Sequence, residues 1–486
     1  MKNRKTPNEK KPTQAEILMS IIDSTTIVSN SGEAYAQISD NRQPGVTQVY
    51  PVAGRDFKNW LNFEFYRRTD KTPTPAMLSS VVSATLGRAR FEGKEQKIYT
   101  RIAGDKTRIL YDLCDGDWRT VMITPNGWSI KPGTGIFKRN SNMAPMPNPV
   151  QGGKIEALKP LVNMSDDDWV LYVAWLVGAL CPWGPYPILF IGGAEGSAKT
   201  TTANFARALV DPARVLSSAP PRDDKDLVVQ AKANRVVSID NVSYVPGWLS
   251  DALCRISVGG GYMVRKLYTD DSLVIFDHQQ PVVLNSIGDI LSNNDLADRS
   301  ISLFLPQVPE KERKTQRSIE AEFKRVLPGV FGGLLTSVSM ALKRLDETKP
   351  SCLARMADFS LWVTAAEPAL PWEPGRFMEV YSSNRADQVQ RSIENNTFTA
   401  AIIDWLGGRG GKIWTGTSKG LLGELKPYAV GRTDSKEWPA TPEAVGKKLR
   451  RLTGFLARAG IDVDFYREPN SARTRKIKIE YTKKCL

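Results

Sequence analysis

This chain of 486 residues has a single histidine, His278, and only five cysteines. One histidine excludes a histidine-rich metal site and makes any serine–histidine–aspartate triad depend on that residue. The cysteines form no CxxC pair, which argues against a disulfide framework or a zinc finger and favours a reducing compartment. They are Cys114, Cys181, Cys254, Cys352 and Cys485. The polar N-terminus has no apolar core of the signal-peptide kind, and no internal repeat is visible.

One uncharged run, residues 169–194, is long enough to suggest a membrane span. Pro182, Gly184, Pro185 and Pro187 divide it into a helix-length piece and a short strand. We therefore expect a buried helix followed by a buried strand, and no membrane partner. Ser165, followed by three aspartates, is the expected N-cap of that helix.

Positive charge is in excess, with 66 lysine and arginine residues against 52 aspartate and glutamate residues, a net charge of +14. The hydrophobic share of 41% is that of an ordinary globular protein. Residues 391–486 hold 19 basic and 10 acidic residues, a net +9, so most of the excess lies in the last fifth of the chain. This distribution predicts a polyanionic partner such as nucleic acid.

An apolar stretch at residues 188–191 leads into a glycine-rich segment and then a helical pattern. Four residues have the GxxGxxK[ST] spacing of a phosphate-binding loop, in which backbone N–H groups surround phosphate oxygens. We expect ATP to bind residues Gly193, Ala194, Glu195, Gly196, Ser197, Ala198, Lys199, Thr200 and Thr201. Lys199 is expected at the β- and γ-phosphates and the Thr200 hydroxyl on Mg²⁺. Ala198 departs from the pattern, because a glycine usually precedes the lysine.

A second apolar strand pattern ends at Asp240, 41 residues after Lys199, and is expected to place a carboxylate on Mg²⁺. The next residue is Asn241, where an acidic residue often polarises the attacking water. The general base therefore stays open: Glu195, Asp223 and Asp224 are substitutes, or each is merely structural.

Two later residues complete the predicted catalytic set of Lys199, Asp240, Asn285 and Arg299. Asn285 ends a third apolar strand and either orients water at the γ-phosphate or caps a turn. Arg299 directly precedes a fourth strand. It is either an arginine finger for a neighbouring subunit's ATP or the ion-pair partner of Asp295 or Asp298; the combined pattern favours the finger.

These elements, in this order, resemble the superfamily 3 helicases of the AAA+ class. Their local sequence is most similar to that of ATPases of bacterial prophages and phage satellites. The resemblance implies a hexamer on single-stranded DNA that moves 3′ to 5′ in the cytoplasm of a bacterial host, close to the nucleoid. It also implies a DNA-gripping hairpin between the second and third strands. Residues 262–276 suit that hairpin, with Arg265 and Lys266 as phosphate contacts, although its tip at residues 269–272 is acidic.

The basic C-terminal segment has a pattern of its own. Val445, Leu449, Leu452, Phe455 and Leu456 recur at helical spacing, and two alternating strand patterns follow on either side of a basic loop. This order resembles a winged-helix domain, whose expected DNA contacts here are Lys447, Lys448, Arg451, Arg473, Arg475 and Lys476. The alternative is a solvated basic face that binds nothing specific.

The predicted fold is α/β, in five parts. They are a basic disordered tail (1–14), an N-terminal α+β accessory domain of primase-derived type (15–150), the AAA+ core (151–310), a helical subdomain (311–390) and the winged helix (391–486). Within the accessory domain, residues 97–131 predict a small antiparallel meander. Asp112, Asp115 and Asp117 there suggest either the metal-binding carboxylates of a primase or, as we favour, a hairpin turn.

The function expected from these features is an ATP-dependent, ring-forming helicase that starts replication of a phage or mobile element. Its partners would be single-stranded DNA, duplex origin DNA, further copies of itself and a primase or host replication proteins. The alternative is an AAA+ switch, a helicase loader or transcriptional regulator, that hydrolyses ATP without unwinding. A metabolic P-loop kinase does not explain the basic C-terminus.

Overall fold

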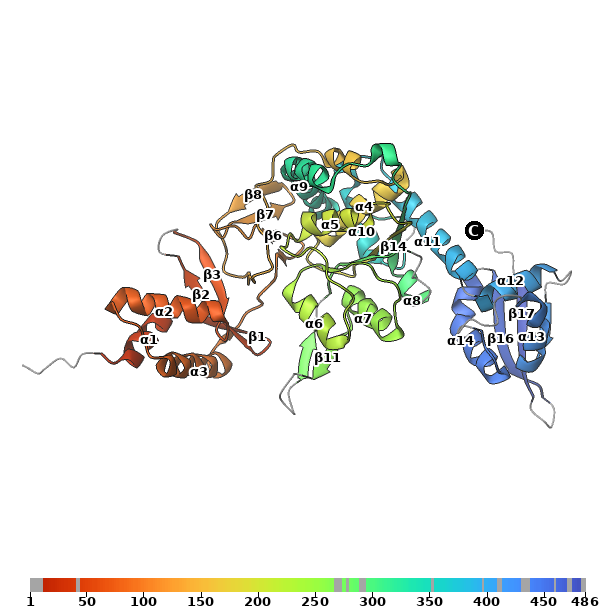
Figure 1. Cartoon of the computed structure of the whole chain (residues 1–486), viewed down its shortest axis with the longest axis horizontal. Helices are drawn as coiled ribbons and strands as arrows, with labels where there is room; N and C mark the ends of the chain where they lie inside the picture. Colours follow the sequence, from red (N-terminus) through yellow and green to blue (C-terminus); the bar gives the residue numbers. More distant parts are fainter. Residues whose placement is uncertain are drawn as a thin grey trace, which may run out of the picture.

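The structure is a computed structural model that shows a mixed α/β protein with several sheets, one of them parallel. It describes residues 12–40, 44–265, 273–276, 279–287, 294–350, 354–395, 397–408, 413–429, 438–458, 460–469 and 474–481. In Figure 1 an N-terminal unit in red and a C-terminal unit in blue lie at opposite ends of a larger central unit.

The N-terminal unit packs three helices on a small sheet. The helices are α1 (Gln14–Asp23), α2 (Arg55–Thr69) and α3 (Pro75–Phe91); the strands are β1 (Thr26–Asn30), β2 (Glu33–Ser39), β3 (Thr47–Pro51) and β4 (Lys94–Glu95). Their order is β3-β2-β1-β4. Thr13 and Glu16 form a capping box that starts α1, and apolar residues of all three helices and of β2 share one core.

A four-stranded antiparallel meander follows, as the alternating pattern predicted. It consists of β5 (Ile102–Gly104), β6 (Ile109–Asp112), β7 (Thr120–Thr124) and β8 (Gly127–Lys131). Most of its buried apolar side chains, including Tyr111 and Val121, belong to the hydrophobic cluster of the central unit, whereas Ala103 and Leu110 pack in a small separate cluster. Trp128 Nε1 donates to Thr336 Oγ1 at 3.2 Å. The segment expected to be one domain, 15–150, thus contributes to two separate cores, because the meander buries its apolar face against the central helices.

The centre of the molecule is a parallel sheet in the order β10-β13-β9-β14. Its strands are β9 (Ile188–Gly193), β10 (Val237–Ile239), β13 (Val282–Asn285) and β14 (Ser300–Leu305). Alternate residues of β9 face opposite cores, with Leu189 and Ile191 in one cluster and Ile188 and Phe190 in another. Because both faces are covered by helices, β9 and β13 are mostly apolar runs, whereas β10 and β14 also carry buried serines, at Ser238, Ser300 and Ser302.

Helices cover the two faces of this sheet. On one side lie α4 (Asp166–Ala179), α5 (Lys199–Val210), α9 (Gln316–Arg344), α10 (Ala357–Ala366) and α11 (Arg376–Asn395); on the other lie α6 (Asp224–Ala233), α7 (Gly247–Val258) and α8 (Asn294–Ala297). Three short 3₁₀ helices complete the unit: η1 (Ile155–Leu161), η2 (Glu310–Glu312) and η3 (Glu367–Ala369). The predicted helical subdomain, 311–390, shares its core with α4, so it packs as part of the central unit.

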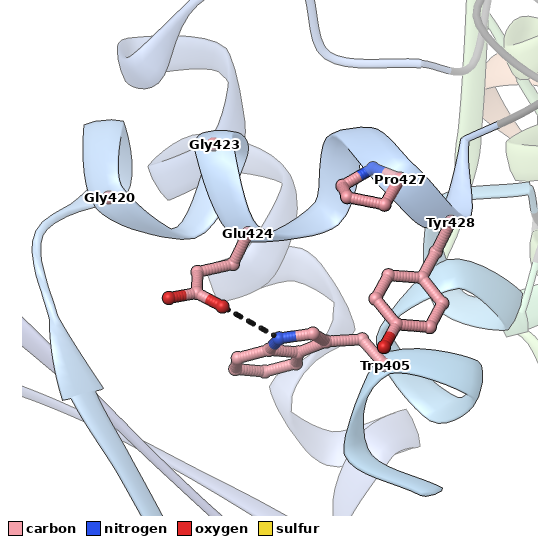
Figure 2. Close-up of a pocket in the computed structure, with 6 residues that line it drawn as sticks. All are labelled: Trp405, Gly420, Gly423, Glu424, Pro427 and Tyr428. Atoms are coloured by element: carbon pink, nitrogen blue, oxygen red, sulfur yellow. Dashed lines mark hydrogen bonds between the residues drawn. The ribbon is translucent and has the colours of Figure 1, made fainter. Parts of the chain in front are cut away.

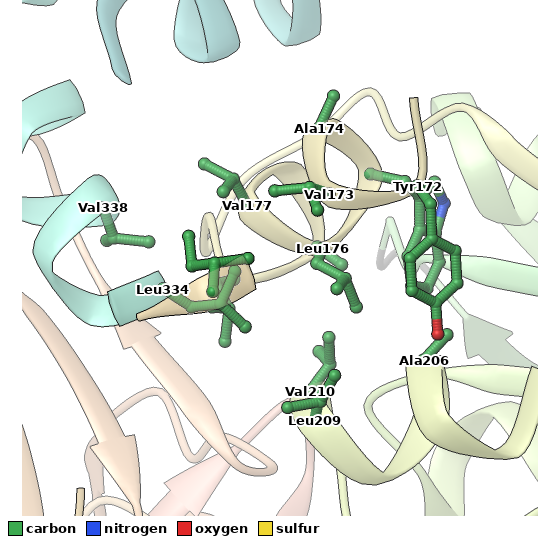
Figure 3. Packing of buried hydrophobic residues seen from close by; sticks show 14 of the residues in the cluster. Tyr172, Val173, Ala174, Leu176, Val177, Ala206, Leu209, Val210, Leu334 and Val338 are labelled. Carbon is green, nitrogen blue, oxygen red and sulfur yellow. The ribbon is translucent and has the colours of Figure 1, made fainter. Parts of the chain in front are cut away.

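The uncharged run suspected of spanning a membrane forms α4 and β9, as expected. Ser165 accepts a hydrogen bond from Asp168 N at 3.1 Å and so caps α4. Every residue of α4 from Trp169 to Ala179 is buried, and Figure 3 shows its side chains between those of α5 and α9. Among the described helices, α9 alone is long and apolar enough for a span, but 67% of its most apolar window is buried inside the protein. It is a core helix.

Two strands between β10 and β13 form the predicted hairpin. They are β11 (Tyr262–Arg265) and β12 (Leu273–Phe276), antiparallel, with β11 in contact with α6 and α7. The backbone of Arg265 belongs to β11. Lys266, His278 and the acidic tip lie outside the described residues.

The C-terminal unit has its own hydrophobic core. Its elements are α12 (Thr397–Gly408), β15 (Ile413–Gly416), α13 (Ser418–Leu425), η4 (Lys426–Tyr428), α14 (Pro442–Arg458), β16 (Ile461–Arg467) and β17 (Arg475–Tyr481). The strands form an antiparallel sheet in the order β15-β17-β16, one strand more than the sequence predicted. Four residues of the predicted apolar stripe of α14 are buried in this core, Val445, Leu449, Leu452 and Leu456, and the side chain of the fifth, Phe455, is outside the described part of the structure.

Candidate functional site: a phosphate-type loop and a basic C-terminal helix

Three parallel strands end at the same edge of the central sheet and bring the predicted site residues together. Asn285 of β13 pairs with Ile191 of β9, and Ile239 of β10 pairs with Leu284, so Asp240 emerges beside Asn285. The chain leaves β9 for strands on one side and later returns to add β14 on the other. In open α/β sheets, ligands bind outside the carboxyl ends of the strands at such a switch point.

The loop from Gly193 to Ala198 joins β9 to α5. Gly193 and Gly196 have φ angles of 147° and 74°, which favour glycine. A Cβ at Gly193 would lie 2.5 Å from Leu305 O, so no larger residue fits there without a shift. Ala198 also has a positive φ, 65°, and stands directly before the helix. Its Cβ costs on the order of 1 kcal/mol relative to glycine in this conformation, so Ala198 adopts a backbone conformation that a glycine would adopt more readily.

Lys199 and Thr200 are the first residues of α5, and both side chains form hydrogen bonds with other residues of the site. Lys199 Nζ donates to Ala194 O at 2.6 Å and to Ser197 Oγ at 3.4 Å. Partial burial lowers the pKa of the Lys199 ammonium, while the carboxylates of Glu195 and Asp240 act in the opposite direction. Thr200 Oγ1 donates to Asp240 Oδ1 at 3.1 Å. A hydroxyl and a carboxylate, separated by 40 residues in sequence, are thus in direct contact.

Asn285 is buried, with 2% of its surface exposed, and its amide is only half used. Its Oδ1 accepts a hydrogen bond from Asn241 N at 2.6 Å, whereas its Nδ2 has no hydrogen-bond partner in the described structure. A buried amide donor without a partner is costly, by about 1–3 kcal/mol, unless something else accepts from it. This orphaned donor at the strand edge is the polar group that a ligand or water would satisfy.

The three candidate general bases differ in their surroundings. Asp223 caps α6 by accepting from Lys225 N and Asp226 N at 3.0 and 2.9 Å, which is a structural role. Asp224 Oδ1 is buried without a hydrogen-bond partner among the described residues. Glu195 lies in the loop itself, near Lys199.

Oxygen ligands at the loop suit Mg²⁺, and the described residues contain no group of three or more histidine, cysteine, aspartate or glutamate side chains that could hold a metal. Mg²⁺ is commonly held by one or two protein oxygens together with substrate phosphates and water. Thr200 and Asp240 are the pair that fits this donor set.

Arg299 forms the ion pair that the sequence left open as its second reading. Its guanidinium pairs with the Asp295 carboxylate, and Nη1 also donates to Asp295 O at 3.0 Å. Arg355 pairs with both Asp295 and Asp298. The Arg299 side chain is therefore held by contacts within its own chain, and its role toward a neighbouring subunit stays a prediction.

The acidic turn before β7 is structural. Asp112 is buried and pairs with Arg139 at 2.6 Å, while Asp115 pairs with Arg119 at 2.6 Å and accepts from its backbone. The carboxylates are satisfied by arginines, as expected of a turn. The primase-like interpretation gains nothing from this geometry.

The predicted DNA contacts of the C-terminal unit fall into two groups. Lys447, Arg451 and Arg475 are exposed, and none has an ion-pair partner among the residues described. By contrast, Lys448 lies over the ring of Phe398 at 5.7 Å and Lys476 pairs with Glu468 at 3.5 Å. Arg473 lies outside the described residues, as does the side chain of Arg265. Among the predicted contacts that the structure describes, the exposed cations without an ion-pair partner therefore lie on one face of α14 and on β17.

An open hollow of about 550 Å³ lies in the same unit, between α12, α13 and η4 (Figure 2). Its lining includes Trp405 and Tyr428, and Trp405 Nε1 donates to Glu424 Oε2 at 3.2 Å. It is separate from the loop at Gly193–Thr200 and holds none of the predicted site residues.

Two family models match consecutive parts of the chain. Residues 155–371 match the actinomycete integrative conjugative element replication protein, and residues 398–484 match the C-terminal domain of this RepA protein. Together they cover more than half of the chain, and they include the loop, the carboxyl ends of β9, β10 and β13, and α14. The chain belongs to this family of mobile-element replication proteins.

No curated protein matches this replication protein. Solved apo structures of the NrS-1 C-terminal region are similar to it at 11% identity, covering 96% of this chain and 99% of that chain with a TM-score of 0.41. A second covers 98% and 100% at 12% identity and a TM-score of 0.39. At TM-scores this low, the likeness carries no part of the argument below.

The sequence did not reveal two features of the replication protein that the structure shows. Arg101, in the segment before β5, forms a buried ion pair with Asp211 at the end of α5, at 3.1 Å. Arg313, directly after η2, lies against Gly196 of the loop. No motif marks either residue, although the basic and acidic run at residues 310–314 was a visible signal for the second.

Proposed function

We propose that this replication protein is an ATP-driven DNA helicase with a P-loop AAA+ core of superfamily 3 type and a C-terminal winged helix. The observation that carries the proposal is the contact of Thr200 with Asp240 beside a loop in which Gly193 and Gly196 have positive φ angles. Family membership supports a role in replicating a mobile element.

The residues of the site divide the work of phosphoryl transfer, which depends mainly on positioning and charge stabilisation. Backbone N–H groups of the loop and the N-terminus of α5 would bind phosphate oxygens, and Lys199 would leave Ala194 O to bind the β- and γ-phosphates. Thr200 and Asp240 would hold Mg²⁺, which neutralises charge on the phosphates. The free Nδ2 of Asn285 would orient water, and Arg299 would exchange Asp295 for the nucleotide of an adjacent subunit.

The arrangement of the C-terminal unit supports duplex binding. Its order is α12, β15, α13, η4, α14, β16 and β17, and two of the exposed predicted contacts, Lys447 and Arg451, lie on α14, directly before the β16–β17 hairpin. A helix of this kind enters the major groove while an adjoining hairpin contacts phosphates.

The test is ATP-dependent strand displacement by the full chain on forked DNA carrying a 3′ or a 5′ tail. We expect Mg²⁺-dependent ATP hydrolysis stimulated by single strands, and displacement from the fork with the 3′ tail. Hydrolysis without displacement would favour the alternative of an AAA+ switch. The Arg299–Asp295 ion pair supports this alternative, because it holds Arg299 within its own chain. Absence of Mg²⁺-dependent hydrolysis would overturn both.

A double substitution, Lys447→Ala with Arg451→Ala, is expected to weaken binding of duplex DNA at every sequence tested. Removing one cation from a phosphate should reduce the slope of log affinity against log salt by about 1, so the slope of the double variant should fall by about 2. Fluorescence anisotropy across a salt series measures it. The matched control is Lys343→Ala with Arg344→Ala, an exposed pair at the end of α9. Equal slopes for the two double variants would contradict the assignment.

A further inference from the structure

The segment that follows β14 lies directly against the candidate phosphate loop. Leu305, the last residue of β14, is paired with Gly193, and Val308 N donates to Gly196 O at 3.2 Å. This backbone hydrogen bond ties residues 306–313 to the middle glycine of the loop. The segment is far from the loop in sequence but forms part of its wall.

Arg313 brings a guanidinium group onto that glycine. Its Nε donates to Val308 O at 3.4 Å, which places the head group. A Cβ built on Gly196 would lie 3.4 Å from Arg313 Nη2 and 4.0 Å from Cζ. Gly196 has a φ of 74°, which disfavours a side chain, and these distances place the guanidinium in van der Waals range of the Gly196 Cα.

Among the residues that the structure describes, no carboxylate forms an ion pair with this guanidinium. Arg313 is exposed and has no ion-pair partner among the described residues, although Glu310 and Glu312 are close in sequence. The other cation of the loop, Lys199, donates to the loop's own Ala194 O and Ser197 Oγ. Glu195 adds a negative charge to the same loop, which opposes phosphate binding and which a second cation would offset.

We propose that Arg313 is a second phosphate-binding cation of this site, acting from the same chain as Lys199. The inference rests on the proposed function, since it requires a nucleotide in the loop. A guanidinium binds two phosphate oxygens at once through its fixed fork of N–H donors, which an ammonium cannot do. Held beside Gly196, it contacts the phosphates as they enter and selects for ligands with more phosphate charge.

Arg313→Ala in the full chain is expected to weaken binding of ADP and of a slowly hydrolysed ATP analogue, measured by titration calorimetry with Mg²⁺. The loss should be about tenfold or more, with the larger effect on the triphosphate. Arg313→Lys should fall between wild type and Arg313→Ala, because it keeps the charge and loses the fork. The control is Arg317→Ala, an exposed arginine in the first turn of α9, which should bind as wild type does.

The outcomes separate this inference from the function on which it rests. If Lys199→Ala loses binding while Arg313→Ala binds as tightly as wild type, Arg313 has no such role and the nucleotide site stands. Equal losses in Arg313→Ala and Arg317→Ala would also overturn the local contact. If the wild-type chain binds neither nucleotide, the proposed function fails and the inference fails with it. Circular dichroism melts confirm folding, and Arg313→Gln serves as a second variant.

Discussion

Lys199→Ala is expected to reduce Mg²⁺-dependent ATP turnover by a hundredfold or more while duplex binding stays at the wild-type level. The first effect follows because the variant removes the ammonium at the β- and γ-phosphates, and loss of one charge-stabilising donor typically costs about 10²–10³ in rate. The second follows because residues 397–481 have a hydrophobic core separate from the central unit. Phosphate release and fluorescence anisotropy, measured on the same preparation, provide the two readouts.

The matched control for Lys199→Ala is Lys225→Ala. Lys225 is exposed on α6 in the same central unit, and its side chain has no partner among the described residues. Its removal should leave turnover and DNA binding unchanged. If Lys199→Ala retained turnover, the loop would not be the phosphate site. If it lost duplex binding as well, the separation of the two functions would be wrong.

Asp211→Ala is expected to destabilise the central unit by about 3–5 kcal/mol, the usual cost of breaking a buried ion pair from one side. Asp211 is 1% exposed and pairs with Arg101 and Arg207, at 3.1 and 3.0 Å. Its second oxygen also accepts from the backbone N–H groups of Arg235 and Val236, which lead into β10. Removing the carboxylate leaves two buried guanidinium groups without their anion, so calorimetric melting should move down by several degrees.

Asp166→Ala is the control, because Asp166 forms only an exposed ion pair with Lys159. Its effect should stay below about 1 kcal/mol. A melting shift for Asp211→Ala no larger than that of the control would show that the buried network contributes little.

The stability difference between wild type and Asp211→Ala should also depend on pH. Burial by itself would raise the pKa of Asp211, but Arg207, Arg101 and two backbone N–H groups hold that pKa below its ordinary value. A carboxyl group with a depressed folded pKa contributes its full stability above its unfolded pKa, near about 4, and loses it as the pH falls through the folded value. The difference should therefore be constant from neutral pH down to about 5 and shrink only in stronger acid.

The loop and its partners could be predicted because each depends on short-range pattern. An apolar run, a set of glycines and a helical stretch specify strand, loop and helix, and parallel strands bring their carboxyl ends to one edge. The proximity of Thr200 to Asp240 followed from that rule alone. The sequence could not decide between the two interpretations of Arg299. An arginine directly before a strand can pair with a nearby aspartate of its own chain or contact the nucleotide of a neighbouring subunit, and the local sequence is the same in both cases.

Contacts between distant segments could not be predicted from one sequence. The meander was expected to belong with the N-terminal helices, since residues 97–131 show the same alternation whichever core they face. Nothing local distinguishes Arg101 from an exposed arginine, yet it is fully buried against Asp211. Likewise, only the three-dimensional path of the chain after β14 brings Arg313 to Gly196.

The Arg101–Asp211 ion pair also determines where the chain can be truncated from its N-terminus without disturbing the central unit. A truncation at residue 151, which the sequence alone recommends, would keep Asp211 and Arg207 but discard Arg101, the other arginine paired with Asp211, and would remove the meander from α9. Such a piece would expose apolar surface and would aggregate on expression. A recombinant fragment that contains the central unit should instead begin between Glu95 and Arg101, after the last strand of the N-terminal sheet.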